Sequence, residues 1–325
     1  MPEKMEKPNS GPTVGIALSG GSGRAIAHIG VLEVLREHKI PIDVITACSS
    51  AAVVAGSFAC GTMEELKKDL FRADKNFVLN FIDLDKSGKG LFSTDKIAAW
   101  GEKYLQGKKF EDVRPRLGFV CGDVNTGELV ILSLGYMIRA ARASGAVPGI
   151  FEPVIWGNRV LVDGGMFSII PINEARAMGA DIVIGVDIAA TRQVIRKKIL
   201  RVWQGYNFLR KSWLFRTIEK IRQFIDLAYQ RTMKIIFYNQ SDFFEKDLVD
   251  EINFLTVLDR AMKLIEKKQK ETKAMPVCDI VLSPNVKHFG KMNFDSARLI
   301  YLEGRRVALE AIPKIESIIR NYKND

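Results

Sequence analysis

Short apolar runs alternate with amphipathic stretches along most of the chain, and each pattern predicts its own kind of element. The run TVGIAL, Thr13–Leu18, predicts a buried strand, and a glycine-rich turn separates it from a helical pattern over Ala25–His38. Thr62 and Glu65 predict a capping box at the start of the helix MEELKKDLFRA. Six further segments predict strands: IDVITA, LGFVCGD, LVILS, NRVLVDGG, ADIVIGVDI and CDIVLSP. With a long helix over Ser296–Tyr322, this alternation predicts an α/β fold, a three-layer α/β/α sandwich around a mostly parallel central sheet.

The same patterns divide the chain into four parts. A polar, proline-containing start predicts a disordered tail over 1–12, and the α/β core follows over 13–191. A basic amphipathic helical insert is expected over 192–240, and the remainder of the core with its C-terminal helix over 241–325. No apolar run approaches the ~18–20 residues that cross a bilayer, and the start lacks the pattern of a signal peptide. We therefore expect a cytoplasmic protein, and its four scattered cysteines indicate neither a metal site nor a disulfide framework.

Positive charge is concentrated in one stretch of the chain. Between Arg192 and Lys234 there are twelve Lys or Arg and two acidic residues, so this stretch accounts for the whole formal net charge of +10. Leu214, Ile218 and Ile221 recur within it at helical spacing, which predicts an amphipathic helix. Such a surface indicates an anionic partner.

A basic amphipathic helix with tryptophans is typical of segments that bind anionic membranes. The residues expected to bind the membrane are Arg196, Lys197, Lys198, Arg201, Trp203 and Trp213. A pair of helices that packs on the domain, or on a second copy as a homodimer, fits the same pattern. No nucleic-acid-binding module accompanies the charge, so nucleic acid is not an expected partner.

The segment DVITACSSAAVVAG contains the first candidate for chemistry. Ser49 has Ala47 two residues before it and Ala51 two residues after it. A nucleophile on a sharp strand-to-helix turn needs such small neighbours, because strand and helix approach each other closely there. Ser50 has a poorer pair of neighbours. A close-packed corner without any chemistry fits the same residues.

Two further motifs follow predicted strands. The loop SGGSGRA lacks the lysine of a P-loop and the third glycine of a dinucleotide-binding fingerprint, but its amides at a helix start suit an oxyanion. Asp163 in VDGG ends a strand, from which it can reach the carboxyl edge of a parallel sheet. An ordinary turn and a turn-capping aspartate are the alternatives. His28 and His38 are not placed as a triad histidine, whereas His288 follows the last predicted strand, from which it could reach the crevice; a structural role is favoured for each.

Together these motifs resemble the patatin-like phospholipases. GIALSGGSGRAIAHIGVLEVL is similar to their oxyanion segment, DVITACSSAAVVAG to their G-T-S-x-G elbow, and ASGAVPGIFEPV and LVDGGMFSIIPI to two later blocks. The resemblance covers about Val14 to Asp187 and resumes over Leu248–Ile319, which resembles bacterial members akin to neuropathy target esterase.

The resemblance implies a lipid acyl hydrolase that acts through an acyl-enzyme and needs neither cofactor nor metal. It implies a dyad in which Ser49 is the nucleophile and Asp163 its base. The oxyanion loop that it implies consists of Gly20, Gly21, Ser22, Gly23 and the bracing Arg24. The substrate class is phospholipid or lysophospholipid, taken from a membrane by a peripherally associated protein. A catalytically silent lipid- or partner-binding protein and an acyltransferase are the alternatives.

Four small residues depart from the family pattern. Ser22, Ala25, Ala47 and Ala51 stand where the family has glycine. Backbone amides survive these replacements, but a serine or alanine held at positive φ is strained by about 1–3 kcal/mol.

Overall fold

A computed structural model describes residues 11–74, 77–81, 92–148, 150–189, 257, 260–261, 263–264, 278–290 and 294–322. By its internal contacts the chain divides into two units, and the described residues belong to the unit formed by Met1–Ala189 and Ile252–Asp325. The expected insert over 192–240 lies outside the described residues, as does the expected tail apart from its last two residues. Both stay predictions.

The described strands form one mixed sheet of eight strands in the order β5-β6-β3-β2-β1-β7-β8, and β4 pairs with β3. The strands are β1 Val14–Leu18, β2 Val44–Cys48, β3 Arg116–Asp123, β4 Leu129–Leu132, β5 Val154–Trp156, β6 Arg159–Asp163, β7 Ile182–Val186 and β8 Ile280–Leu282. The run from β3 through β2, β1 and β7 to β8 is parallel. β4 and β6 both pair antiparallel with β3, and β5 pairs antiparallel with β6.

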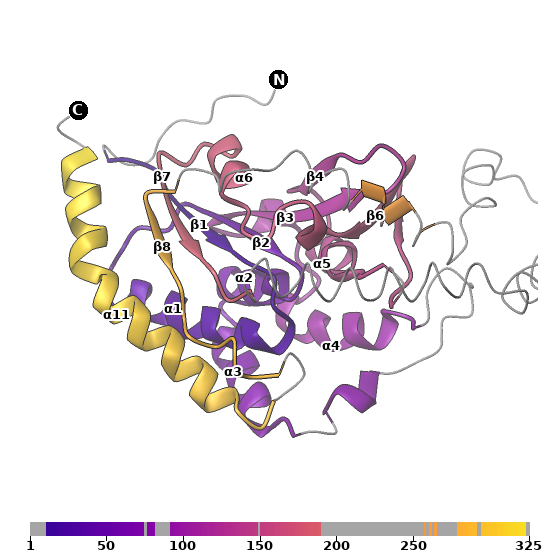
Figure 1. The fold of residues 1–325 in the computed structure, drawn as a ribbon, viewed down its shortest axis with the longest axis horizontal. Coiled ribbons are helices and arrows are strands. Elements are labelled where there is room, and N and C mark those ends of the chain that lie inside the picture. The colour runs from indigo at the N-terminus through magenta and orange to yellow at the C-terminus, as the bar shows by residue number, and fades with distance from the viewer. Residues whose placement is uncertain are drawn as a thin grey trace, which may run out of the picture. The chain divides into compact units, whose positions relative to one another are not determined.

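Helices cover both faces of the sheet, with α1, α3 and α4 on one side and α6 on the other (Figure 1). The α-helices are α1 Ile26–Glu37, α2 Ala51–Cys60, α3 Met63–Arg72, α4 Asp95–Leu105, α5 Met137–Gly145, α6 Ile172–Ala177 and α11 Ala297–Tyr322. The 3-10 helices are η1 Ser22–Ala25, η2 Phe77–Phe81, η3 Phe110–Asp112 and η4 Gly164–Met166. The larger apolar core joins the sheet to α1, α2, α3 and α11, and a smaller one lies between β1, β7 and α6. The predicted α/β sandwich is therefore confirmed.

The C-terminal helix α11 lies along α1 at very short range (Figure 1). A Cβ added at Gly30 would overlap the carbonyl oxygen of Tyr301, and one added at Gly304 would overlap that of Ala27. The buried carboxylate of Glu33 fastens the crossing, because it accepts hydrogen bonds from Lys67 at 2.7 Å and from the Tyr301 hydroxyl at 2.5 Å. The two backbones can approach this closely because glycine faces each of them.

One local expectation is wrong. Helix α3 begins at Met63, but Thr62 does not cap it, because its hydroxyl donates instead to the carbonyl oxygens of Ser57 and Tyr104. Thr62 thus joins α2 to α4. Among the described residues, no helix combines the length and the apolar character needed to cross a membrane.

Candidate active site

Ser49 occupies a tight turn between strand β2 and helix α2. The strand ends at Cys48 and the helix begins at Ala51, which leaves two residues for the turn. The φ angle of Ser49 is +57°, a left-handed value that is costly for any residue with a side chain. Backbone strain of this kind, at a strand-to-helix turn, is the geometry that raises a nucleophile above the edge of a sheet.

The buried residue Ser144 on α5 holds the backbone of this turn. Its hydroxyl accepts the Ser49 N–H at 2.9 Å and donates to the Val120 carbonyl oxygen at 2.7 Å. The Ser49 amide is therefore engaged by a side chain. Sequence reasoning missed this contact, because a serine among alanines in a helix carries no signal of a partner 95 residues away.

The glycine-rich loop lies directly against Ser49. It follows β1, the strand that pairs parallel with β2, and a Cβ added at Gly20 would lie 3.2 Å from the Ser49 Cβ. Ser22 has a φ of +55°, and its carbonyl oxygen accepts the Ser50 hydroxyl at 3.0 Å. The loop and the turn thus meet at the carboxyl ends of two neighbouring parallel strands, where α/β proteins bind ligands.

The loop presents backbone amides to this corner. The Gly20 N–H bonds the Ile169 carbonyl oxygen at 3.3 Å. For the amides of Gly21, Ser22 and Gly23, no acceptor is found within the described part of the chain. Free amides at the start of a helical segment are the donors that an oxyanion requires.

Arg24 ties the loop to a distant part of the chain. Its guanidinium donates to the Phe289 carbonyl oxygen at 2.7 and 3.0 Å and to that of Lys287 at 2.9 Å. The side chain is buried, and burial lowers the pKa of the guanidinium. The bracing role expected for Arg24 has a physical basis here, since three hydrogen bonds fix the base of the loop.

Asp163 reaches the same corner on an antiparallel strand. β3 extends beyond β2, whose Cys48 pairs with Val120, and β6 runs back along this extension until Asp163 pairs with Cys121. The carboxylate is buried, and its Oδ1 accepts the Gly165 N–H at 2.7 Å. The Cys48 thiol also donates to Oδ1, at 3.9 Å. The structure thus places Asp163 beside the residue that precedes Ser49, while a direct Ser49–Asp163 hydrogen bond stays a prediction.

Residues 16–176, which include the loop, the turn and Asp163, match the family model of the patatin-like phospholipases. This part of the chain belongs to the patatin-like phospholipase family. An uncharacterised NTE family protein of Mycobacterium tuberculosis is 31% identical over 180 residues, which are 55% of this chain and 50% of that protein. Lysophospholipase NTE1 of Saccharomyces cerevisiae is 29% identical over 193 residues, 56% of this chain and 11% of that protein.

The chain thus spans about half the length of the mycobacterial relatives that it matches and a much smaller part of the yeast ones. Among solved structures, VipD from Legionella pneumophila aligns with a TM-score of 0.35 at 12% identity, over 79% of this chain and 67% of that one. A likeness this low carries no argument about the site.

Two buried thiols, those of Cys48 and Cys121, lie next to Asp163 at the candidate site. Burial raises the pKa of Cys48 well above its usual range, and the nearby charge of Asp163 raises it further. The pKa of Cys121 is raised well above its usual range by the same two causes. Both side chains therefore stay neutral at physiological pH, whereas the thiolate is the reactive form of cysteine. The neutral Cys48 thiol instead donates a hydrogen bond to Asp163.

His28 is a structural residue of the patatin-like domain. It is fully buried in α1, and its Nε2 bonds the Ser19 carbonyl oxygen at 2.8 Å. Burial lowers its pKa to about 4, against the opposing effect of that hydrogen bond, so the ring is neutral and donates. His38 and His288 are exposed, and the ring centroid of His288 lies 4.1 Å from that of Phe289.

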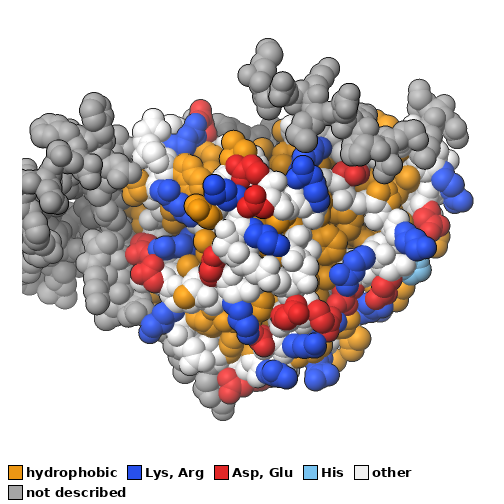
Figure 2. Space-filling view, turned by 180° about the vertical axis from the view of Figure 1, so that it is seen from behind, with side chains coloured by type: hydrophobic (Ala, Val, Ile, Leu, Met, Phe, Trp, Pro, Cys, Tyr) orange, Lys and Arg blue, Asp and Glu red, His pale blue; other side chains and the backbone are white. Residues whose placement is uncertain are grey.

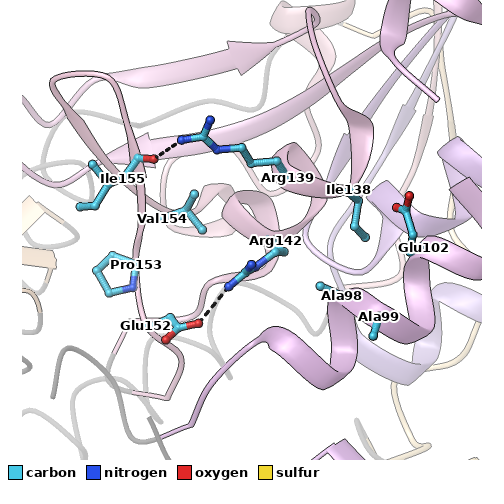
Figure 3. A pocket seen from close by; sticks show the side chains of 10 residues that line it. All are labelled: Ala98, Ala99, Glu102, Ile138, Arg139, Arg142, Glu152, Pro153, Val154 and Ile155. Carbon is cyan, nitrogen blue, oxygen red and sulfur yellow. Dashed lines mark hydrogen bonds and ion pairs between the residues drawn. The ribbon is translucent and has the colours of Figure 1, made fainter. Parts of the chain in front are cut away.

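A pocket of about 560 Å³ lies between α4, α5 and the start of β5, and none of the predicted site residues lines it (Figure 3). Arg142 crosses it to Glu152 at 3.1 Å, and Arg139 donates to the Ile155 carbonyl oxygen at 2.8 Å. Much of its wall is apolar, from Ile138, Val154 and neighbouring alanines.

The six residues expected to bind the membrane all lie outside the described residues. On the face of the patatin-like domain that Figure 2 shows, Lys and Arg are interspersed with Asp and Glu. That mixture agrees with the balanced charge of the chain outside Arg192–Lys234. Within the described residues, no cluster of three or more His, Cys, Asp or Glu side chains could hold a metal ion.

Proposed function

We propose that this protein is a lipid acyl hydrolase that cleaves carboxylic esters through an acyl-enzyme on Ser49. The observation that carries the proposal is the strained turn at Ser49, with φ of +57°, packed against a loop with available amides. The family of residues 16–176 and the relatives named lysophospholipase support a lysophospholipid or phospholipid as substrate.

The proposed reaction uses the Ser49 hydroxyl, the Asp163 carboxylate and the backbone amides of the glycine-rich loop. Ser49 Oγ attacks the ester carbonyl carbon while its proton passes to the Asp163 carboxylate, and the resulting oxyanion is stabilised by the amides of Gly21–Gly23. When the intermediate collapses, the alcohol leaves with that proton, and the acyl group stays on Ser49. Water, deprotonated by Asp163, then attacks the acyl-enzyme, which releases the fatty acid and restores Ser49. The Gly165 amide and the Cys48 thiol orient the carboxylate by donating to its Oδ1.

A fluorophosphonate probe tests this proposal directly, because it reacts preferentially with an activated serine. We expect one adduct per chain, located on Ser49 by peptide mass spectrometry, and none in Ser49→Ala. Ser57→Ala is a matched control, since it removes a serine hydroxyl from α2, the helix that follows the turn, and within the described part of the chain that hydroxyl bonds only the Val54 carbonyl oxygen. An adduct on Ser50, or labelling that persists in Ser49→Ala, would show that the elbow is assigned wrongly.

Membrane association through the basic stretch is the second half of the proposal. The stretch Arg192–Lys234 accounts for the net charge of +10, and each Lys or Arg near an anionic surface contributes about 1 kcal/mol. Reversing Arg196, Lys197, Lys198 and Arg201 to Glu is expected to release the protein from phosphatidylcholine vesicles that contain phosphatidylserine. Turnover of a short soluble ester is expected to persist.

A control with the same charge change reverses four exposed residues of the described domain: Arg36, Lys68, Lys314 and Arg320. It is expected to stay bound to the vesicles. The fluorescence of Trp203 and Trp213 should shift to the blue on binding. If both variants stay bound and neither tryptophan responds, the stretch is a packing or homodimer element, and a soluble esterase is the better description. Absence of any probe adduct in the wild type would favour the silent lipid- or partner-binding protein, and transfer of the acyl group to an added alcohol would favour an acyltransferase.

A further inference from the structure

One hydrogen bond links the turn at Ser49 to the oxyanion loop. The Ser50 hydroxyl donates to the Ser22 carbonyl oxygen at 3.0 Å. Ser50 is the N-cap residue of α2, yet its side chain does not cap that helix. An N-cap serine ordinarily accepts an amide of its own helix, so here the hydroxyl is diverted to a different element.

The bond acts on a residue whose backbone angle is unfavourable. Ser22 has a φ of +55°, a value that glycine adopts freely and serine does not. The peptide that joins Ser22 to Gly23 is planar and trans, so its C=O and N–H point in opposite directions. Holding the Ser22 carbonyl oxygen therefore also fixes the direction of the Gly23 N–H, one of the loop amides without an acceptor in the described part of the chain.

We infer that Ser50 is a positioning residue: its hydroxyl holds the Ser22–Gly23 peptide so that the Gly23 amide donates to the oxyanion of the ester intermediate. The inference rests on the proposed function and deepens it. Ser22 and Ser50 act as a pair: the hydrogen bond from Ser50 stabilises a positive φ at Ser22 that a glycine would adopt without help.

Steady-state kinetics on a short-chain p-nitrophenyl ester test the pair. Ser50→Ala is expected to lower kcat roughly three- to tenfold with KM unchanged, because the lost interaction serves the transition state alone. Ser50→Thr retains a hydroxyl and is expected to restore most of kcat. Ser57→Ala, which removes a 2.9 Å hydrogen bond within α2, is the control and should leave kcat and KM near wild type.

The decisive comparison repeats the Ser50→Ala change in a Ser22→Gly background. Glycine adopts the positive φ without help, so the loss of kcat caused by Ser50→Ala should shrink to less than about twofold. An equal loss in both backgrounds, no loss at all, or a change in KM alone would overturn the inference.

Failure of the proposed function is distinguishable from failure of this pair. If the wild type neither turns over esters nor forms an adduct on Ser49, the proposal of a hydrolase is wrong. Thermal unfolding of the wild type, Ser50→Ala, Ser22→Gly and the double variant still measures the coupling of Ser22 and Ser50. Ser50→Ala should then lower the Tm more in the wild-type background than in the Ser22→Gly background. Equal shifts would overturn the coupling of the two residues.

Discussion

The two turns of the candidate site and the crossing of α1 with α11 use small residues in opposite ways. At the crossing, Gly30 and Gly304 have ordinary helical backbones, and glycine is required only because a Cβ would overlap a carbonyl group of the other helix. At the turns, Ser49 and Ser22 have positive φ angles that favour glycine, yet both keep a side chain. At the crossing, the lack of space for a Cβ atom requires glycine. At the two turns, serine is kept although its backbone conformation is strained.

The largest expected effect is on the chemistry of the turns. Asp163→Asn should lower kcat by about 10³–10⁴-fold, because the amide cannot accept the proton of Ser49. The free energy of unfolding should change little, since asparagine keeps an oxygen that can accept the Gly165 N–H. Ester hydrolysis and urea denaturation measure the two quantities. A variant that keeps more than about a tenth of the wild-type kcat would remove Asp163 from the dyad.

The opposite result is expected at the crossing. Gly304→Ala should lower the free energy of unfolding by about 3 kcal/mol, because the new Cβ meets the rigid backbone of Ala27. Gly145→Ala is the matched control: nothing lies within 4 Å of its Cβ position, and it should be neutral or slightly stabilising. Urea denaturation monitored by circular dichroism checks both. Equal stabilities for the two variants would mean that α11 shifts to accommodate the methyl group.

His28 connects the two regions, since it lies in α1 and bonds Ser19 at the entrance to the glycine-rich loop. Its pKa in the folded protein is about 4, below the usual 6.5, so between these values the unfolded chain binds more protons than the folded one. Stability should therefore fall as the pH falls below 6.5, by about 2 kcal/mol at pH 5, and level off below 4. Denaturation midpoints at several pH values measure this loss. His28→Gln should lack this component, and an unchanged pH dependence in that variant would assign it to other groups.

The smallest expected effect isolates the strain itself. Ser49→Ala and Ser49→Gly both lack the nucleophile, but only glycine is comfortable at a φ of +57°. Ser49→Gly should therefore be more stable than Ser49→Ala by about 1 kcal/mol. Differential scanning calorimetry of this pair measures the strain without the complication of a lost hydroxyl. If the two variants melted together, the turn would relax on its own, and the contrast with the crossing would disappear.

Much of the fold follows from periodicity in the sequence. The apolar runs predicted β1 and β2 closely, and the predicted helix over Ser296–Tyr322 begins one residue before α11. Thr62 shows where local rules fail: its capping box is plausible from the sequence, but two carbonyl groups of neighbouring helices compete for the hydroxyl. Acceptors from other helices cannot be predicted from the residues that surround Thr62 in the sequence.

The sequence nominates the residues of the candidate site, whose roles stay predictions, but it does not reveal how the chain brings them together. Small neighbours pointed to Ser49, and a double glycine pointed to Asp163. The antiparallel direction of β6 was not readable, because strand direction depends on how the chain returns to the sheet. The support from Ser144, the acceptors of Arg24 and the positive φ of Ser22 likewise arise only when separate segments meet.

The hydrogen bonds of Arg24 also have a consequence for the order of synthesis. The glycine-rich loop follows β1, the first described strand to be synthesised, but the carbonyl groups that bind Arg24 of this loop belong to Lys287 and Phe289, more than 260 residues later. A nascent chain that already contains Ser49 and Asp163 lacks this brace until the later segment has emerged. We therefore expect the loop to reach its final conformation only after that segment has been synthesised, which would make completion of the proposed site a late step of folding.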